Sequence, residues 1–583
     1  MKQFFISYLL LIGLVPVVNG QGFLKTSGQK IVDEKGKNII LRGMGLGGWM
    51  LQEGYMLKLQ GINPQYSIRN RIEQLIGTDK TKKFYEAWLA NFTTKADIDS
   101  MRKWGFNSVR LPMHYNLYTL PVDKEPDSTR QTWIEEGFRL TDSLLSWCKA
   151  NEMYLILDLH AAPGGQGNDL NISDRDSTKP SLWQSEANKA KTIALWKKLA
   201  ERYKDEPWIG AYDIINEPNW GFDDPADKNG LKEPRNIPLR DLMVKITDAI
   251  RSVDKKHIVI IEGNGWGNNY KGVFPLWDDN IVISFHKYWN YNDPRSIQHM
   301  VDARNQNNAP VWVGETGENS NTWFTDAVQL FESNNIGWCW WPLKKLGNNN
   351  PLEVHSNPKY NLLLDYWNGY GNTARPSESD AFYGLMELAS QTNVRYNSVR
   401  SDVIDALIRQ PFDNKTTPFA KVKISPEGYT INAVDYDLGR NGIAYYDKDT
   451  GNYHVSTGRR SAGNKGRMYR NDGVDIYTDS LNEGTFYVGS IQDGEWLQYT
   501  VDLNSNVNHI LKLIAAGSDS SNITVNVDGK PQFSNIALNT AGNSTGWQTQ
   551  SIGRLKLKKG RHVIRLRANK GGFTLKQLVL SRQ

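Results

Sequence analysis

The stretch YDIINEPN, residues Tyr212–Asn219, decides how this sequence is interpreted. Its apolar and β-branched residues show no helical period, and the run ends abruptly at Asn216-Glu217-Pro218. Because proline cannot continue the hydrogen bonding of a strand, the pattern predicts a buried parallel strand with a carboxylate at its carboxyl end. The stretch Val311-Trp-Val-Gly-Glu315-Thr-Gly has the same form. Glu217 and Glu315 are therefore the first candidate functional residues.

Strand-like runs alternate with amphipathic helical runs from residue 22 to residue 411. A capping box at Thr94-x-x-Asp97 opens one helix, and the final helical region, Asp380–Arg409, is expected to close the ring. Such alternation predicts the α/β class and favours a (β/α)8 TIM barrel over an open sheet. The expected strands are Leu41–Met44, Asn107–Leu111, Tyr154–Leu159, Gly210–Ile215, His257–Ile261, Ile281–Phe285, Val311–Val313 and Gly337–Trp340.

The pattern changes after the barrel. Residues 412–422 are expected to form a linker that contains a proline, and residues 423–583 show short strands separated by Gly, Asn and Asp turns. These features predict an all-β sandwich of the jelly-roll type. At 583 residues, the chain is long enough for two or three domains.

Composition limits the partners and the compartment. A formal net charge of +6 over 583 residues gives no reason to expect a nucleic-acid partner. Residues 1–20 have the basic start, apolar stretch and small residues of a signal peptide, so we expect a secreted, extracellular or periplasmic protein without a membrane span. Cys148 and Cys339 fall in a helix and a strand and are not expected to pair, and no metal or other cofactor is predicted.

Polar and aromatic side chains follow every predicted barrel strand. The carboxyl ends of barrel strands form the functional face of this fold, so these side chains are expected to meet at one mouth. In chain order they are Trp49, Arg110, His160, Asn216, Glu217, Asn264, Trp266, His286, Tyr288, Glu315 and Trp341.

Glu217 and Glu315 follow strands that face each other across an eight-stranded ring. Two such carboxylates are what glycoside hydrolysis needs, since one protonates the leaving oxygen while the other attacks the sugar or activates water. The retaining geometry, with carboxyl groups roughly 5–5.5 Å apart, and the inverting geometry, roughly 6.5–9.5 Å, both remain open at this point.

The rim motifs resemble glycoside hydrolase family 5 over residues 22–411. The matching motifs are Asn107-Ser-Val-Arg110-Leu-Pro, Asp158-Leu-His160, Asn216-Glu217-Pro218, His286-Lys-Tyr288, Gly314-Glu315 and Trp341. The resemblance implies a retaining double displacement with Glu217 as acid/base and Glu315 as nucleophile. It further implies substrate-binding or orienting roles for the other rim residues: Asn216 at the sugar 2-hydroxyl, Arg110 and Tyr288 beside Glu315, His160 and His286 along the site, and Trp341 as its floor.

The substrate expected from the resemblance is a β-glucan with β-1,3, β-1,4 or mixed linkage. Leu46-Gly-Gly-Trp49 resembles segments of family members that act on β-1,3-glucans. Trp266, Trp289 and Trp323 are candidate sugar platforms that would serve equally well in core packing. A β-mannanase, a transglycosylase and a glycan-binding protein without activity are the alternatives. We expect a monomer.

The C-terminal region resembles carbohydrate-binding module family 6. The motifs are Tyr469–Asp475, Gly494–Tyr499, Thr545-Gly-Trp547-Gln-Thr and Gly571-Gly-Phe573. Trp547 matches the aromatic residue that stacks on sugars in that family. The pattern departs at other positions: Ser490 replaces an aromatic, Lys576 replaces an asparagine, and Asn432 and Val434 replace acidic calcium ligands, so no calcium is expected. Glycan binding is the favoured role and a brace on the barrel is the alternative.

Overall fold

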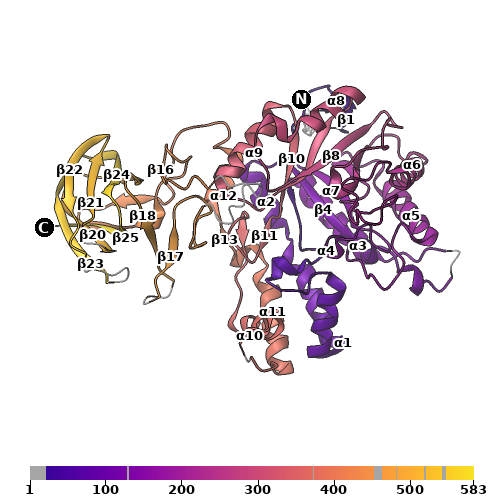
Figure 1. Cartoon of the computed structure of the whole chain (residues 1–583), viewed down its shortest axis with the longest axis horizontal. Helices are drawn as coiled ribbons and strands as arrows, with labels where there is room; N and C mark the ends of the chain where they lie inside the picture. Colours follow the sequence, from indigo (N-terminus) through magenta and orange to yellow (C-terminus); the bar gives the residue numbers. More distant parts are fainter. Residues whose placement is uncertain are drawn as a thin grey trace, which may run out of the picture.

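The computed structural model describes residues 22–582, except 128–129, 372, 452–462, 481, 483, 518–519 and 541–545. The expected signal peptide at residues 1–20 lies outside the described residues. Two domains lie side by side along the long axis of the molecule, with the helix-rich one first in sequence and the C-terminus at the far end of the second (Figure 1).

A closed barrel of parallel strands forms the centre of the first domain, in the order β10-β3-β4-β5-β6-β7-β8-β9. Pairing of Trp338 with Arg42 and of Trp340 with Met44 closes the ring between the last strand and the first. The predicted TIM barrel is confirmed. Its strands are β3 (Arg42–Gly45), β4 (Ser108–His114), β5 (Tyr154–Ala161), β6 (Ile209–Asp213), β7 (Ile258–Glu262), β8 (Ile281–Lys287), β9 (Val311–Gly317) and β10 (Gly337–Trp341).

Most barrel strands are buried along their whole length, as the apolar runs in the sequence predict for a sheet covered on both faces. Strand β6 is shorter than expected, because regular pairing ends at Asp213 instead of Ile215. Residues 214–217 leave the strand in an irregular path that brings Glu217 over the barrel mouth.

Helices surround the barrel and also build a lobe that projects from it. The helix α1 contains a break at Gly77, where φ is 76°. Together with α10 and α11 it forms the lobe below the barrel in Figure 1. The helices are α1 (Gln65–Phe92), α2 (Lys95–Trp104), α3 (Glu135–Ala150), α4 (Leu170–Ser173), α5 (Glu186–Tyr203), α6 (Ile237–Arg251), α7 (Asn264–Gly267), α8 (Gln298–Asn307), α9 (Asn321–Ser333), α10 (Pro358–Asn368), α11 (Glu378–Gln391) and α12 (Ser401–Ile408).

The expectation that residues 380–409 close the ring is met by α12 and not by α11. Helix α11 packs against α1 in the lobe, and α12 packs against α9. A Cβ at Gly105, the residue after α2, would lie 3.1 Å from Ile408 at the end of α12, so α12 lies between the helices that follow β9 and β3. The predicted capping box is present, since the Thr94 N–H donates to Asp97 Oδ2 at 2.8 Å.

The second domain is the predicted β-sandwich of two sheets, ordered β14-β19-β24-β21-β22 and β17-β18-β25-β20-β23. Between α12 and the first strand, Thr417 pairs with Leu438 of the sandwich. The strands are β14 (Val422–Ile424), β15 (Gly428–Asn432), β16 (Tyr445–Tyr446), β17 (Ile476–Thr478), β18 (Phe486–Ile491), β19 (Trp496–Leu503), β20 (Val507–Gly517), β21 (Asn522–Val527), β22 (Lys530–Ala537), β23 (Gln548–Leu557), β24 (Gly560–Lys570) and β25 (Phe573–Arg582).

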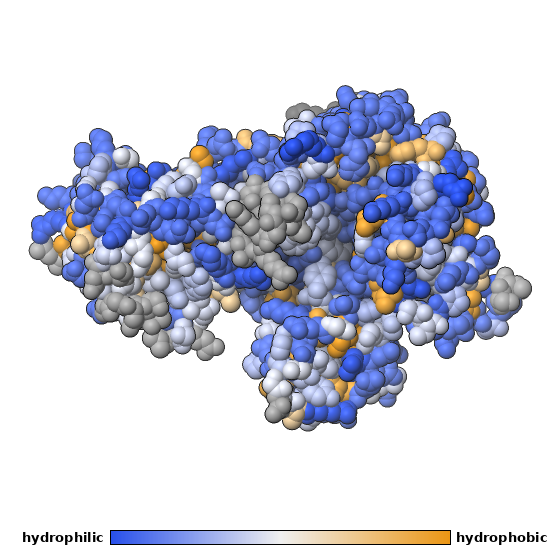
Figure 2. All heavy atoms as spheres, in the orientation of Figure 1, coloured by the Kyte–Doolittle hydropathy of each residue, from blue (hydrophilic) through white to orange (hydrophobic). Residues whose placement is uncertain are grey.

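The surface in Figure 2 is mainly hydrophilic, with apolar residues scattered over it, and it is hollowed between the barrel and the projecting lobe. Cys148 and Cys339 are buried and unpaired, as the sequence predicts. Within the described part of the chain, none of the helices combines the length and apolar character needed to cross a bilayer.

Candidate active site

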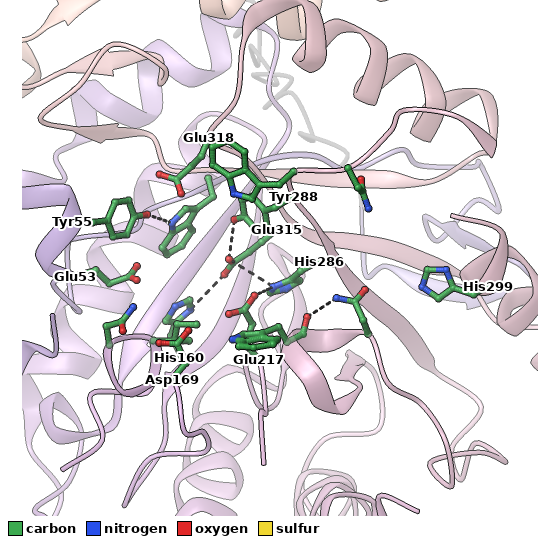
Figure 3. A pocket seen from close by; sticks show the side chains of 17 residues that line it. Glu53, Tyr55, His160, Asp169, Glu217, His286, Tyr288, His299, Glu315 and Glu318 are labelled. Atoms are coloured by element: carbon green, nitrogen blue, oxygen red, sulfur yellow. Dashed lines mark hydrogen bonds and ion pairs between the residues drawn. The ribbon is translucent and has the colours of Figure 1, made fainter. Parts of the chain in front are cut away.

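A cavity of about 690 Å³ opens at the carboxyl ends of the barrel strands (Figure 3). Side chains that follow seven of the eight strands contribute to its wall, with only the segment after β4 missing. The lining residues are Glu53, Tyr55, His160, Asp169, Asn171, Ile172, Glu217, Trp266, Asn268, His286, Tyr288, Trp289, Asn290, His299, Glu315, Glu318 and Trp341.

Glu217 has a backbone conformation that few side chains adopt. Its φ is 44°, in the left-handed region, and its N–H donates to Glu262 Oε2 at 2.8 Å. Its Oε1 lies 2.6 Å from His286 Nδ1 in a hydrogen bond. Backbone strain of this kind occurs where surrounding contacts fix a functional side chain, and here the contacts aim a carboxyl group into the cavity.

Glu315 lies near the end of β9 with both oxygens engaged. Arg110 Nη1 donates to its Oε1 at 2.5 Å, and the Tyr288 hydroxyl donates to its Oε2 at 3.2 Å. One carboxylate oxygen of Glu315 lies within 4.8 Å of one oxygen of Glu217. The two carboxyl groups predicted from the strand ends therefore meet across one small space.

Arg110 is a fully buried cation that supports the site from below. Its Nη2 donates to Asp213 Oδ2 at 2.8 Å and to Asn216 Oδ1 at 2.9 Å, and it lies 3.2 Å from Glu262 Oε1. Burial opposes its charge, but the surrounding carboxylates, Asp158 foremost, hold its pKa well above the ordinary value. A guanidinium with these neighbours is a permanent positive charge beside Glu315.

His160 connects the buried charges to the floor of the cavity. Its Nδ1 bonds to Asp158 Oδ2 at 2.8 Å, and its ring stacks on Trp341 with centroids 5.1 Å apart and planes 4° from parallel. Burial lowers the pKa of His160, yet Asp158 more than offsets this and raises it. The Nε1–H of Trp341 donates to the Tyr55 hydroxyl at 3.0 Å, and this bond fixes the indole that forms the cavity floor.

His286 is held between three carboxylates. Its Nδ1 lies 3.7 Å from Glu315 Oε2, and its Nε2 lies 3.2 Å from Glu262 Oε1. Burial alone would lower its pKa, but Glu262, Glu315 and Glu217 together raise it well above the ordinary value. The three carboxylates therefore favour the protonated form of this imidazole beside Glu217.

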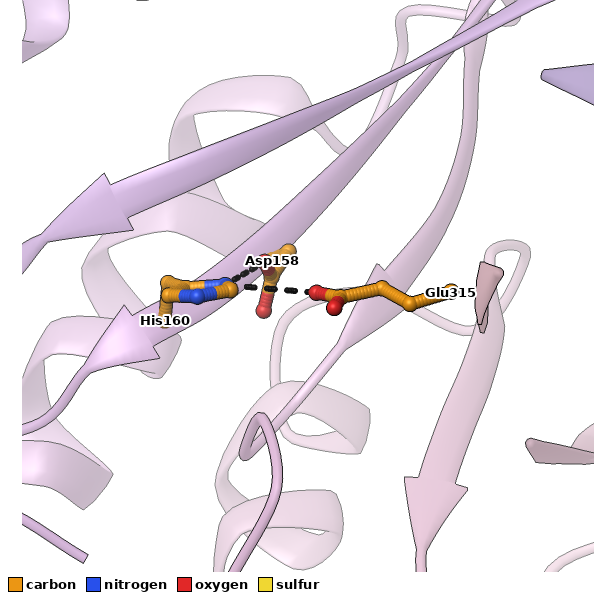
Figure 4. Close-up of side chains that lie close together, drawn as sticks. All are labelled: Asp158, His160 and Glu315. Atoms are coloured by element: carbon orange, nitrogen blue, oxygen red, sulfur yellow. Dashed lines mark hydrogen bonds and ion pairs between the residues drawn. The ribbon is translucent and has the colours of Figure 1, made fainter. Parts of the chain in front are cut away.

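Two groups of side chains have the spacing of a metal site. Asp158, His160 and Glu315 form one (Figure 4), and Glu217, His286 and Glu315 form the other. In the first, Arg110 Nη1 already lies 3.2 Å from Asp158 Oδ2 and 2.5 Å from Glu315 Oε1. A second cation there would be repelled by the guanidinium, so the donors fit charge pairing within the protein better than metal ligation.

One predicted aromatic position, Trp49, differs from expectation, and for Trp323 the structure favours core packing over a sugar platform. Trp49 is 2% exposed and its Nε1 donates to Leu89 O, so it packs against α1 instead of lining the mouth. Trp323 is fully buried, with its Nε1 bonded to Asn290 O. Trp266 and Trp289 do line the cavity. Asn264 holds the rim together by donating to Trp220 O at 2.7 Å, away from the cavity.

Several acidic residues of the site were missed in the sequence. Asp213 and Glu262 stand inside apolar strand runs, and a charge at such a position signals a buried partner, here Arg110. Glu53 and Glu318 line the cavity from segments without a motif. Burial, with a contribution from Glu315, raises the pKa of Glu53 to about 8.

The sandwich places two tyrosine rings near the predicted Trp547. Tyr487 meets Trp547 edge-on at 5.2 Å, and Tyr477 stacks on Tyr487 at 5.7 Å. Lys576 Nζ lies over the Trp547 ring at 5.3 Å. Ser490, which replaces an expected aromatic, lies 3.2 Å from the Tyr477 hydroxyl. Aromatic rings therefore remain near this position, although Ser490 supplies none.

Each of the two domains matches a known family. Residues 68–347 match the family model of Cellulase (glycosyl hydrolase family 5), and residues 467–582 match Carbohydrate binding module (family 6). A β-xylosidase of Phanerodontia chrysosporium is 28% identical over 379 residues, covering 59% of this chain and 75% of the relative. Endoglucanase C of Acetivibrio thermocellus is 29% identical over 199 residues, covering 34% and 50%.

A third relative is a probable glucan 1,3-beta-glucosidase A of Aspergillus clavatus, 27% identical over 252 residues that cover 43% of this chain and 55% of the relative. The chain thus spans about half the length of two of these relatives and three quarters of the other. The family matches cover the barrel with its paired glutamates and the aromatic end of the sandwich. The chain is therefore a glycosidase, with a barrel that belongs to glycoside hydrolase family 5 and a C-terminal domain that belongs to carbohydrate-binding module family 6.

Proposed function

We propose that this glycosidase is a secreted, retaining hydrolase of β-linked glucan. The observation that carries the mechanism is the separation of the paired carboxyl groups, since an oxygen of Glu217 lies within 4.8 Å of an oxygen of Glu315. This spacing favours the retaining geometry of roughly 5–5.5 Å, because an inverting enzyme needs roughly 6.5–9.5 Å to admit a water molecule.

In the first step, Glu315 attacks the anomeric carbon and forms a glycosyl ester. Arg110 and Tyr288 aim this carboxylate, since each hydrogen bonds to one of its oxygens. Glu217 protonates the leaving oxygen, and the proton is held along its 2.6 Å hydrogen bond to His286.

In the second step, Glu217 takes a proton from water, and that water breaks the ester at Glu315. We assign the contact with the sugar 2-hydroxyl to Asn216, and the orientation of its amide by Arg110 on one side and by His160, at 3.3 Å, on the other supports this role. Trp341, stacked on His160, offers the floor on which the sugar ring packs.

A β-glucan is the preferred substrate, with β-1,3, β-1,4 and mixed linkages all to be compared. The relatives' names add β-1,3-glucoside and β-xyloside to the substrates worth testing. Mannan hydrolysis and transglycosylation would use the same covalent intermediate. Export rests on residues 1–20 and is checked by sequencing the amino terminus of the mature protein.

The test has two parts. Proton NMR during hydrolysis of laminarin, lichenan, carboxymethylcellulose, glucomannan and aryl β-xyloside identifies the substrate and the first anomer released. We expect the β anomer, and release of the α anomer would refute the retaining mechanism. In the Glu315→Ala variant kcat is expected to fall by about 10³-fold or more. The exposed Glu152→Ala variant serves as the control, and equal activity of Glu315→Ala would reject the nucleophile.

A further inference from the structure

A second cavity of about 490 Å³ adjoins the catalytic cavity. Tyr55, in the short helix η1 (Gly54–Leu57), lines both of them. In Figure 3 this tyrosine lies at the edge of the catalytic cavity, on the side away from His299. Tyr55 therefore stands between the space above Glu217 and Glu315 and the second cavity.

The walls of the second cavity come from two segments that the structure holds together. The Gln60 N–H donates to Asn368 Oδ1 at 2.8 Å, and Asn368 Nδ2 donates to Lys58 O at 3.0 Å. Behind them, the hydroxyl of buried Tyr360 donates to Leu57 O at 2.8 Å. The end of η1 and the end of α10 are thus fixed to each other, which reduces the ordering cost of binding.

The lining has the chemistry of a site for neutral sugars. Tyr370 is 49% exposed and offers an aromatic surface, and its hydroxyl accepts a hydrogen bond from Gln60. Asn361 and Asn368 add amides, while Lys58 and Asp365 contribute one charge of each sign. Aromatic faces beside amide groups suit pyranose rings, and the absence of a charge excess in this lining favours no acidic or basic ligand.

The segments that line this cavity flank the range matched by the family model. The lining residues fall within 55–60 and 361–370, whereas the match to glycoside hydrolase family 5 covers residues 68–347. The helices α1, α10 and α11 form the projecting lobe, and α10 carries one wall of the cavity (Figure 1). The lobe therefore supplies one wall of this cavity.

We infer that the second cavity is a distal subsite that binds sugar units of the same glycan chain whose bond is cleaved at Glu217 and Glu315. The inference rests on the proposed function, since it assumes that the catalytic cavity accepts a glycan. Through this subsite the enzyme selects long, neutral chains over short oligosaccharides, with Tyr55 and Tyr370 as the aromatic contacts along the path.

The test measures kcat/KM on glucan oligosaccharides of about two to about eight units, using the full chain. In the wild type, kcat/KM should continue to rise with length after the catalytic cavity is filled. Replacing Tyr370 by alanine should lower kcat/KM about fivefold on the longest substrates and leave the shortest ones unchanged, as expected for loss of one aromatic contact. Tyr396→Ala, which removes a ring that is 53% exposed and outside this cavity, is the matched control.

Three outcomes would overturn the inference: a wild-type plateau at the shortest cleaved substrate, an equal loss at every length, or no loss at any length. If Tyr370→Ala does not fold, as judged by thermal unfolding, the length dependence of the wild type decides alone. Tyr370→Phe keeps the ring and should retain the preference for long chains. A wild type inactive on every glucan would instead refute the proposed function, so the two failures are distinguishable.

Discussion

At the residue scale, Arg110 carries the electrostatics of the site. It contacts the buried carboxylates of Asp158, Asp213, Glu262 and Glu315. Arg110→Met leaves these groups without their cation, and breaking a buried pair in this way costs about 3–5 kcal/mol. We expect urea unfolding at about pH 8 to show this loss and unfolding at about pH 5 to show a smaller one, because protonation then neutralises carboxylates. A loss independent of pH would contradict the electrostatic explanation.

Glu53 gives a second prediction at this scale, on stability against pH. Burial, with a contribution from nearby carboxylates, raises its pKa from 4.5 to about 8 in the folded protein. Its neutral form is favoured by folding, so its contribution to stability is complete below about pH 4.5 and is lost as the pH rises through about 8. Glu53→Gln stays neutral. The melting temperature of Glu53→Gln should therefore rise relative to that of the wild type as the pH increases from about 4.5 to about 8.

Differential scanning calorimetry of both proteins between about pH 4 and about pH 9 checks this difference. Exposed Glu152→Gln, with a side chain 62% exposed, should show no such change with pH and is the control. A constant offset between Glu53→Gln and wild type would mean that Glu53 does not titrate in this range.

At the scale of elements, close packing between the β3 loop and β10 determines the cavity floor. A Cβ at Gly47 would lie 2.5 Å from the Trp341 ring, and one at Gly45 would lie 2.7 Å from it. Gly47→Ala should displace the indole, lower kcat/KM about tenfold or more, and cost about 1–3 kcal/mol through overpacking. The Trp341→Phe variant alone weakens the stacking on His160. In the double variant, the smaller ring relieves the clash with the methyl group that Gly47→Ala adds. Simple additivity in this double-mutant cycle would refute the packing argument.

Most of the barrel could be predicted from the sequence, because buried parallel strands leave continuous apolar runs. The rim residues Arg110, Glu217 and Glu315 could be predicted as well, since each follows such a run. The aromatic residues could not be assigned from sequence. Trp49 lies just beyond the carboxyl end of β3 and Trp341 ends β10, yet only Trp341 lines the cavity, while Trp49 turns toward α1. Contacts between segments far apart in the sequence determine which way such a side chain turns. The position of Glu53 in the cavity wall and the packing of the lobe depend on contacts of the same kind, so the sequence did not predict them.

At the scale of the whole molecule, the sandwich braces a loop of the catalytic site. The Asn321 N–H donates to Asn471 O at 2.8 Å, and Asn471 Nδ2 donates to Asn319 O at 2.8 Å. Asp402 of α12 accepts from the N–H of Asn471 at 2.9 Å. Because Glu318 lines the catalytic cavity one residue before Asn319, the second domain contacts the segment that shapes the site.

Two substitutions separate this brace from glycan binding by the sandwich. Asn471→Ala should loosen the loop after β9 and lower kcat/KM on a soluble glucan by about 2- to 12-fold, the equivalent of one hydrogen bond of about 0.5–1.5 kcal/mol. Trp547→Ala, far from that loop in sequence and beside Tyr487 in the sandwich, should keep soluble activity and reduce retention on insoluble glucan. Unchanged soluble activity of a folded Asn471→Ala protein would show that the barrel does not depend on this contact. Undiminished retention of Trp547→Ala would reject its stacking role, because a sugar held by that indole cannot bind equally well without it.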